Sequence, residues 1–253
     1  MSGTGRTNGG PGRLGNVLSG LAVAVGCVLF LGGFVWGAVE YRPYTVPTNS
    51  MDPTVKAGDR ILAQRISGGA ARRGDVVVFT DSQWGNMPMV KRVVGVGGDK
   101  IACCDTDGRL TVNGEAVEEP YVRGAIGGRA SMNDFSATVP EDQLFLLGDE
   151  RGASLDSRLH LQDPGQGSVP RSAVDARVDA VAWPLGGLVD RPKGFAALPG
   201  GVSGPGPLKL LAGSVVAGAL LILGGAAYGP VAGLVSKRRR AARPGERVSA
   251  GVR

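Results

Sequence analysis

Two long apolar runs bracket a more polar stretch of the chain. Residues 14–39 and 210–236 contain no charged side chain and are rich in Leu, Val, Ala and Gly. A helix needs about 20 apolar residues to cross roughly 30 Å of hydrocarbon, so each run is long enough to span a membrane. A cleaved signal peptide is the alternative for the first run, but its apolar core would be only about 7–15 residues long. The pattern therefore predicts two transmembrane helices.

Both runs also contain glycine spacings that allow close helix packing. Gly33-x-x-x-Gly37 lies in the first run, and Gly225-x-x-x-Gly229-x-x-x-Gly233 lies in the second. Small residues four apart let the backbones of two membrane helices approach each other closely. The chain contains 43 glycines, and chance is the better explanation of these spacings.

Between the two runs the pattern changes to short segments rich in β-branched residues. Residues 110–112 lead into Asn113-Gly114, a strong short signal for a β-hairpin, and residues 115–117 continue it. The stretch shows no convincing amphipathic helix of ten or more residues. The predicted fold is therefore mostly β, a single extracytoplasmic β-rich domain between two transmembrane helices. The other expected strands are residues 60–63, 75–79, 90–96, 144–147 and 177–183.

Three segments of this stretch lack a strand pattern. Residues 123–137 and 160–172 are polar and Gly-rich, and we expect surface loops there. Residues 184–207 are rich in Gly and Pro and are expected to be a linker to the second span. The predicted organisation is a tail (1–13), a first span (14–39), a central domain with its linker (40–207), a second span (208–236) and a basic tail (237–253).

The net charge of +6 belongs to the ends of the chain. Residues 40–207 contain 18 Lys and Arg against 21 Asp and Glu, whereas the tail after Ser236 holds seven basic residues and only Glu246 as an acid. A positive net charge could have suggested nucleic-acid binding, but the central domain does not carry it, so we expect no nucleic-acid partner. Positive charge beside a span marks its cytoplasmic side. We therefore expect both tails in the cytoplasm and the central domain on the outer side of the cell membrane. The lipid bilayer is the first expected partner.

Cysteine and histidine are scarce. The three cysteines show no Cx2C spacing, so neither a metal site nor a cofactor is expected. A disulfide between the neighbours Cys103 and Cys104 would be strained, and their redox state stays open. The single histidine, His160, lies in a polar stretch and is expected at the surface, which disfavours a Ser-His-Asp triad.

The most informative candidate is Ser50, eleven residues after the first run and flanked by Pro47 and Pro53. Eleven residues reach at most about 40 Å, so Ser50 is expected near the membrane surface. A serine nucleophile needs a base, and a neutral lysine can serve. With a pKa near 10.4, only about 0.04% of a lysine is neutral at pH 7, so burial has to lower that pKa. Lys91, which follows Met89-Val90, is such a lysine, although an exposed lysine on a strand is the commoner case.

Four boxes in this order carry a resemblance to a known family. Residues 47–54 surround Ser50, residues 73–77 and 91–95 follow, and residues 148–158 are rich in charge. Together they closely resemble bacterial type I signal peptidases, membrane-bound serine endopeptidases that remove signal peptides from secretory preproteins. The resemblance covers residues 41 to about 185, and the second span is similar to that of some actinobacterial members.

The resemblance implies a role for each matching residue. Ser50 is then the nucleophile and Lys91 the general base, acting through an acyl-enzyme without a cofactor. Thr48 would complete the oxyanion hole, and Ser154 would orient the lysine. The substrate would carry small residues three and one before the cut. The matching charged residues that would brace the site are Asp149, Arg151, Asp156 and Arg158, and the matching apolar residues of the substrate pockets are Val46, Met51 and Val90.

Two positions depart from the family pattern. Glu150 stands where Asn is usual, and Asn49 stands where Gly or Ser is usual. Neither change removes a catalytic atom, but both put rate and specificity in doubt. Two other functions stay open: maturation of one dedicated precursor, and a catalytically silent β-domain that binds secreted proteins. Cleavage of a panel of unrelated secretory precursors would distinguish general signal peptide removal from the first of these functions. The presence of the Ser50 and Lys91 pair argues against the second.

Overall fold

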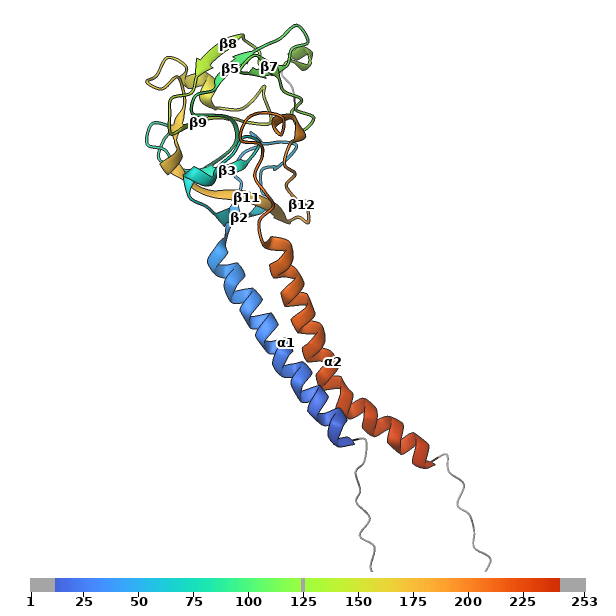
Figure 1. Ribbon diagram of the computed structural model, residues 1–253. Helices are drawn as coiled ribbons and strands as arrows, with labels where there is room; N and C mark the ends of the chain where they lie inside the picture. The colour runs from blue at the N-terminus through green and yellow to red at the C-terminus, as the bar shows by residue number, and fades with distance from the viewer. Residues whose placement is uncertain (1–11, 124–125, 242–253) are drawn as a thin grey trace, which may run out of the picture. The chain divides into compact units, whose positions relative to one another are not determined.

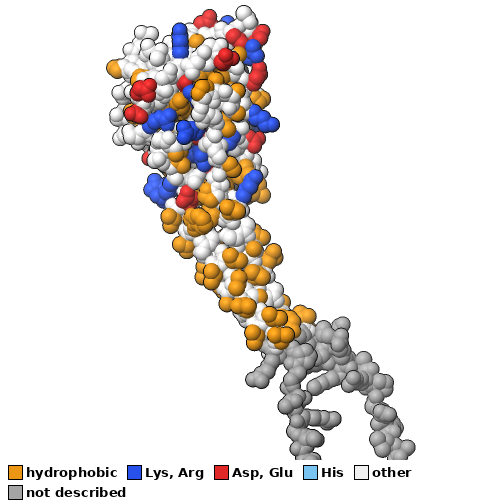
Figure 2. Space-filling view, viewed as in Figure 1, with side chains coloured by type: hydrophobic (Ala, Val, Ile, Leu, Met, Phe, Trp, Pro, Cys, Tyr) orange, Lys and Arg blue, Asp and Glu red, His pale blue; other side chains and the backbone are white. Residues whose placement is uncertain are grey.

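The computed structural model describes residues 12–123 and 126–241, in two compact units (Figure 1). The helical unit contains the described residues up to Gly37 and from Pro207 onward, and residues 38–206 form the β-rich unit. Helix α1 covers Gly12–Glu40, and helix α2 covers Leu208–Ala241 with Pro230 inside it. Both helices are long and apolar enough to cross a membrane, and Figure 2 shows their hydrophobic side chains. Most of the two predicted tails lies outside the described residues.

Helices α1 and α2 pack against each other in antiparallel directions. The Ser19 hydroxyl donates a hydrogen bond of 2.7 Å to the Gly225 carbonyl. Further along, a Cβ added to Gly26 would lie 2.8 Å from the Gly218 carbonyl oxygen. Only glycine allows the two backbones to come this close.

The predicted glycine spacings are only partly used in this packing. Gly33 and Gly225 do face the partner helix, but a Cβ at Gly37 or Gly229 would meet nothing within 4 Å. Among the α1 residues in contact with α2 are Ser19, Gly26 and Gly33, which are seven apart. A seven-residue spacing keeps small residues on one stripe of a helix over several turns, which a single four-residue spacing does not ensure.

The β-rich unit is built from antiparallel strands in two sheets. The larger sheet has the order β1-β2-β11-β3-β4-β9-β10, and β12 also pairs with β11. The smaller sheet has the order β7-β6-β5-β8. The strands of the larger sheet are β1 Tyr41–Thr45, β2 Arg60–Arg65, β3 Val76–Phe79, β4 Met89–Val96, β9 Gln143–Leu147, β10 Val169–Pro170, β11 Val174–Trp183 and β12 Gly187–Leu188, and those of the smaller sheet are β5 Lys100–Cys103, β6 Leu110–Val112, β7 Glu115–Ala116 and β8 Phe135–Thr138.

Five short 3₁₀ turns connect these strands in the described part of the chain, and the unit has no longer helix. They are η1 Gly68–Ala70, η2 Ile126–Gly128, η3 Ser157–His160, η4 Arg171–Ala173 and η5 Lys193–Phe195. The mostly β prediction is therefore confirmed. The predicted hairpin is also present: β6 pairs with β7, and Asn113 and Gly114 have the positive φ angles of 55° and 86° that its turn requires.

The strands at the centre of the larger sheet are apolar on both faces. All four residues of β3 are fully buried, as expected for a strand with core on each side. One core cluster contains Val76 and Val78, and a second contains Val77 and Phe79. Because β3 pairs with β4, this packing holds β4 rigidly in the sheet.

Several short strands were not predicted from the sequence. Strands β1, β5 and β12 lie in segments without a clear alternation. Strand β8 begins within residues 123–137 and β10 lies within residues 160–172, so the prediction that these two segments are only surface loops was wrong. Two to five residues supply too little periodicity to be recognised, and tertiary pairing decides their conformation.

The predicted linker is also different in the structure. Residues 184–206 contain β12 and η5, and Val189, Phe195 and Leu198 are buried in the core clusters. Arg191 pairs with Asp179 of β11 at 2.5 Å. A Gly- and Pro-rich composition suggested a flexible linker, but a few apolar anchors are enough to fold this segment onto the sheets.

Cys103 and Cys104 form a disulfide at the end of β5. The sequence left their redox state open and counted strain against such a bond. Cys103 is buried in the core cluster of the smaller sheet.

We expect Gly218→Leu to separate α1 from α2. A Cβ at Gly218 would lie 2.5 Å from the Phe30 backbone nitrogen, so the backbones must move apart. With Cys27 replaced by serine and spin labels on the exposed positions Leu21 and Leu223, the label separation should increase by about 2 Å or more. Gly224→Leu, whose Cβ meets nothing within 4 Å, is the matched control. An unchanged separation in Gly218→Leu would contradict this packing.

Candidate active site

Ser50 lies in a tight turn that follows β1. The Val46 amide donates to the Asp59 carbonyl at 2.9 Å, and the Gly58 amide returns a bond to Val46 at 2.8 Å, so the base of this loop is closed. Within the loop, Met51 and Val55 are fully buried in a core cluster. These apolar anchors fix the turn and leave the neighbouring Ser50 half-buried.

Lys91 reaches this serine from β4. Successive residues of a strand face opposite sides, so Lys91 and its neighbour Arg92 leave β4 in opposite directions. Lys91 is 4% exposed, and its Nζ donates a hydrogen bond to Ser50 Oγ at 2.7 Å. The structure thus brings together two side chains that are 41 residues apart in the sequence.

Burial lowers the pKa of Lys91 from 10.5 to about 8. Water that would solvate an ammonium group is excluded, which favours the neutral amine. The carboxylates of Asp156 and Asp149 oppose this effect, and the Arg158 guanidinium adds to it. With a pKa of about 8, roughly a tenth of the lysine is neutral at pH 7, some hundreds of times more than in water.

Thr48 and the Ser50 amide lie beside the nucleophile. Thr48 Oγ1 is 3.3 Å from Ser50 Oγ, as the donor of a long hydrogen bond. The Ser50 N–H has no acceptor within the described residues. Two such donors next to an attacking oxygen are the elements of an oxyanion hole.

A groove with a volume of about 360 Å³ opens beside Ser50 and Lys91. Two of the three predicted pocket residues, Val46 and Val90, line it. Met51 does not, because its side chain is fully buried in the core. Several other residues that line the groove were not predicted from the sequence. Besides Ser50, Lys91, Val46 and Val90, the groove is lined by Pro47, Thr48, Asn49, Pro88, Met89, Ala153 and Leu155.

The charged residues predicted to brace the site form buried ion pairs. Arg92 pairs with Asp149 at 2.6 Å, with side-chain exposures of 1% and 0%. The Asp156 carboxylate accepts from Arg158 at 2.7 Å and from the Gly148 amide at 3.0 Å. Buried charges are tolerated only when they are paired in this way.

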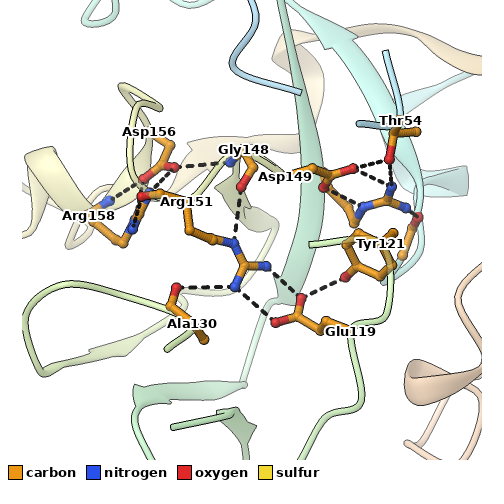
Figure 3. A network of polar contacts seen from close by, with 11 residues as sticks. Thr54, Glu119, Tyr121, Ala130, Gly148, Asp149, Arg151, Asp156 and Arg158 are labelled. Carbon is orange, nitrogen blue, oxygen red and sulfur yellow. Dashed lines mark hydrogen bonds and ion pairs between the residues drawn. The ribbon is translucent and has the colours of Figure 1, made fainter. Parts of the chain in front are cut away.

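Figure 3 shows that these pairs are joined by residues that the sequence analysis did not assign. Glu119 accepts from Arg151 at 2.6 Å and from the Tyr121 hydroxyl at 2.6 Å. The Tyr121 ring lies under the Arg92 guanidinium, 3.8 Å from the ring centroid. Burial and the Glu119 carboxylate raise the pKa of Tyr121, which keeps its donating proton. The segment that contains Glu119 and Tyr121 has no motif, so only the fold reveals this link.

The Ser154 hydroxyl makes no hydrogen bond to Lys91. Its hydroxyl is buried without a partner among residues 12–123 and 126–241, so its lysine-orienting role stays a prediction. Gly148 lies against it: a Cβ at Gly148 would collide with Ser154 Oγ and lie 2.5 Å from the Ser50 carbonyl oxygen. Gly148 is therefore required for the close approach of the two serines.

The two residues that depart from the family pattern have structural partners. The Glu150 amide donates to the Ser50 carbonyl at 3.1 Å, and its carboxylate lies 3.6 Å from Arg123. Arg123 also pairs with Asp52 at 2.8 Å. Asn49 Oδ1 accepts from the Ala57 amide at 2.9 Å, which supports the turn.

His160 has contacts away from the dyad. Its ring stacks on Trp84 and its Nδ1 is 2.8 Å from Asp163 Oδ2.

Comparison with known proteins places this geometry in a family. The family model described as signal peptidase, peptidase S26, matches residues 16–183. A probable signal peptidase I of Mycobacterium leprae is 31% identical, over 56% of this chain and 68% of its own length. Signal peptidase I of Mycobacterium tuberculosis is 32% identical over 65% of its length, and signal peptidase IB of Staphylococcus aureus is 32% identical over 88%. A crystal structure of a signal peptidase I from Enterococcus faecalis has 28% identity over 42% of this chain and 94% of its own, with a TM-score of 0.35.

The chain therefore belongs to the signal peptidase family, peptidase S26. It is a serine peptidase, and its fold is a mostly β unit accompanied by two helices long enough to cross a membrane. The predicted family and fold class are confirmed. The roles of the individual site residues stay predictions.

Gly148→Ala is expected to reduce turnover by at least about 10²-fold, because the new methyl group must push Ser154 or Ser50 out of place. The measurement is the rate of preprotein cleavage, with folding checked by circular dichroism. Gly152→Ala is the matched control, because the nearest atom to its Cβ would be Glu150 Oε1 at 3.5 Å. Wild-type turnover in Gly148→Ala would show that this close approach is not needed.

Proposed function

We propose that the protein removes signal peptides from secretory preproteins with Ser50 as nucleophile and Lys91 as general base. The observation that carries this proposal is the 2.7 Å contact between Lys91 Nζ and Ser50 Oγ beside an open groove. Its support is the family membership together with the lowered pKa of Lys91.

The open edge of β4 offers a binding mode for the substrate. Strand β9 pairs with β4 only from Arg92 onward, so residues 89–91 have no strand partner on that side within the described chain. An extended peptide can add to such an edge through backbone hydrogen bonds. Its scissile bond would then lie beside Ser50. The family resemblance implies small side chains three and one before the cut, and Val46 and Val90, which line the groove, are the apolar residues that they would contact.

The chemistry follows from the two side chains. The neutral Lys91 amine takes the hydroxyl proton as Ser50 Oγ attacks the scissile carbonyl carbon. The C–N bond breaks, the lysine gives the proton to the leaving amine, and an ester remains on Ser50. Lys91 then takes a proton from water as the water oxygen attacks the ester carbon. The ester C–O bond breaks, Lys91 returns the proton to Ser50 Oγ, and the new carboxyl end of the cleaved peptide is released. The Ser50 N–H and Thr48 hydroxyl would stabilise the oxyanion in both steps.

In a membrane, α1 and α2 would anchor the β-rich unit to the bilayer. The seven basic residues after Ser236 favour a cytoplasmic C-terminus, and two spans then place both tails inside and the β-rich unit outside. The apolar segment of a signal peptide would lie in the same bilayer.

Ser50→Ala and Lys91→Ala should each lower cleavage by at least about 10⁴-fold while the protein stays folded. Lys91→Arg should be equally inactive, because a guanidinium group does not lose its proton at usable pH. The measurement is incubation with one preprotein in detergent, followed by N-terminal sequencing of the product. Lys100→Arg, an exposed lysine on β5, should retain wild-type activity. Normal cleavage by Lys91→Arg would remove the lysine from the mechanism.

The rate should rise with pH through the pKa of Lys91 and level off above it. Because the neutral amine is the active form, kcat/KM should increase about tenfold per pH unit below about 8. A pH profile of the purified enzyme with one peptide substrate checks this. A rate independent of pH between about 6 and 9 would contradict a lysine base.

External protease should degrade the β-rich unit in wall-free cells but spare a tag on either tail. The reason is the basic charge beside the spans, which is retained in the cytoplasm. Immunoblots of both tags before and after lysis measure the protection. Removal of the C-terminal tag from outside would show that α2 does not span.

A further inference from the structure

Leu155 is a large apolar side chain that lines the groove and is nevertheless exposed. It is 73% exposed, although it contributes to the same cavity as Ser50 and Lys91. Its contribution to the core is therefore small, and the fold does not explain it. A large apolar side chain left open beside reacting atoms is typical of a surface that contacts a ligand.

The backbone holds Leu155 in a fixed place. Its neighbours Ser154 and Asp156 are 9% and 0% exposed. The Asp156 carboxylate accepts from the Gly148 amide and from Arg158, and the Ala153 amide donates to the Glu150 carbonyl at 3.2 Å. The exposure of Leu155 is thus not that of a loose loop, since its main chain is anchored on both sides.

The groove has an inner and an outer wall, distinguished by exposure. Val46, 3% exposed, and the half-buried Val90 form the inner wall, and Leu155 forms the outer one. Side chains of an extended peptide point alternately to opposite sides. If the residues three and one before the cut contact the inner wall, the residue between them points away from it, toward the solvent to which Leu155 is exposed.

We propose that Leu155 is a specificity-determining residue that contacts the side chain of the second residue before the cut and favours an apolar one there. The proposal rests on the proposed function, because it needs a peptide bound in this groove. The contact buries two apolar surfaces that are otherwise in water, and the leucine is already in position before the substrate arrives.

The test uses a preprotein series that differs only at this second position, with Leu, Ala or Glu. Wild-type enzyme should cleave the Leu substrate with a kcat/KM roughly 5- to 10-fold above that of the Ala substrate, mainly through KM. In Leu155→Ala this preference should fall to within about twofold, and Leu155→Met should retain most of it. Leu159→Ala is the matched control: Leu159 is 63% exposed but lines a different cavity, with Ser131 and Arg151.

Each outcome decides the proposal. A preference that survives in Leu155→Ala, a flat wild-type series, or an equal loss in Leu159→Ala would overturn the role of Leu155 and leave the peptidase function intact. If wild-type enzyme cleaves no member of the series, the proposed function itself fails, and this proposal fails with it. Loss confined to Leu155→Ala, with rescue by Leu155→Met, is the supporting result.

Discussion

Exclusion of water lets a lysine lose its proton near neutral pH, and the proposed site depends on this effect. Lys91 is 4% exposed, and burial is the main cause of its lowered pKa. The same burial requires a rigid setting, since a mobile side chain would find water. Strand β4 supplies that setting because β3 beside it is fully buried, and the buried Met51 fixes the turn that holds Ser50.

The charges around the lysine have to be balanced as well. Asp149 and Asp156 would hold a proton on Lys91 if they were unpaired, because both raise its pKa. Asp149 pairs with Arg92 and Asp156 pairs with Arg158, and the Arg158 guanidinium itself lowers the pKa of Lys91. Glu119 and Tyr121 join these pairs to Arg151, so the groups that tune the base belong to one connected network (Figure 3). Removing one member would leave another buried charge without a partner.

Long-period features of the fold were predictable, and short ones were not. The sequence predicts two membrane-spanning helices from uncharged runs of more than 25 residues. It also predicts a strand from a β-branched segment such as residues 90–96. Two-residue strands, and the segment 184–206 with its buried Phe195, carry no such signal. Their conformation is decided by the surfaces that they meet. The glycine contacts between α1 and α2 could not be predicted for the same reason. Which face of α1 contacts α2 depends on how the two helices pack together, and the sequence of one helix alone does not show it.

The sequence by itself determined the class of protein and the two residues on which the proposed chemistry rests. Ser50 and Lys91 lie in short, residue-specific motifs, and such a local motif can be recognised without knowledge of the fold. Only the tertiary structure decided that Met51 anchors the turn and does not line the groove, that Glu119 and Tyr121 support the site, and that Leu155 stands exposed on its wall. The physical reason is that burial, and the pairing of charges within it, arise from residues that are distant in sequence, so no local pattern records them.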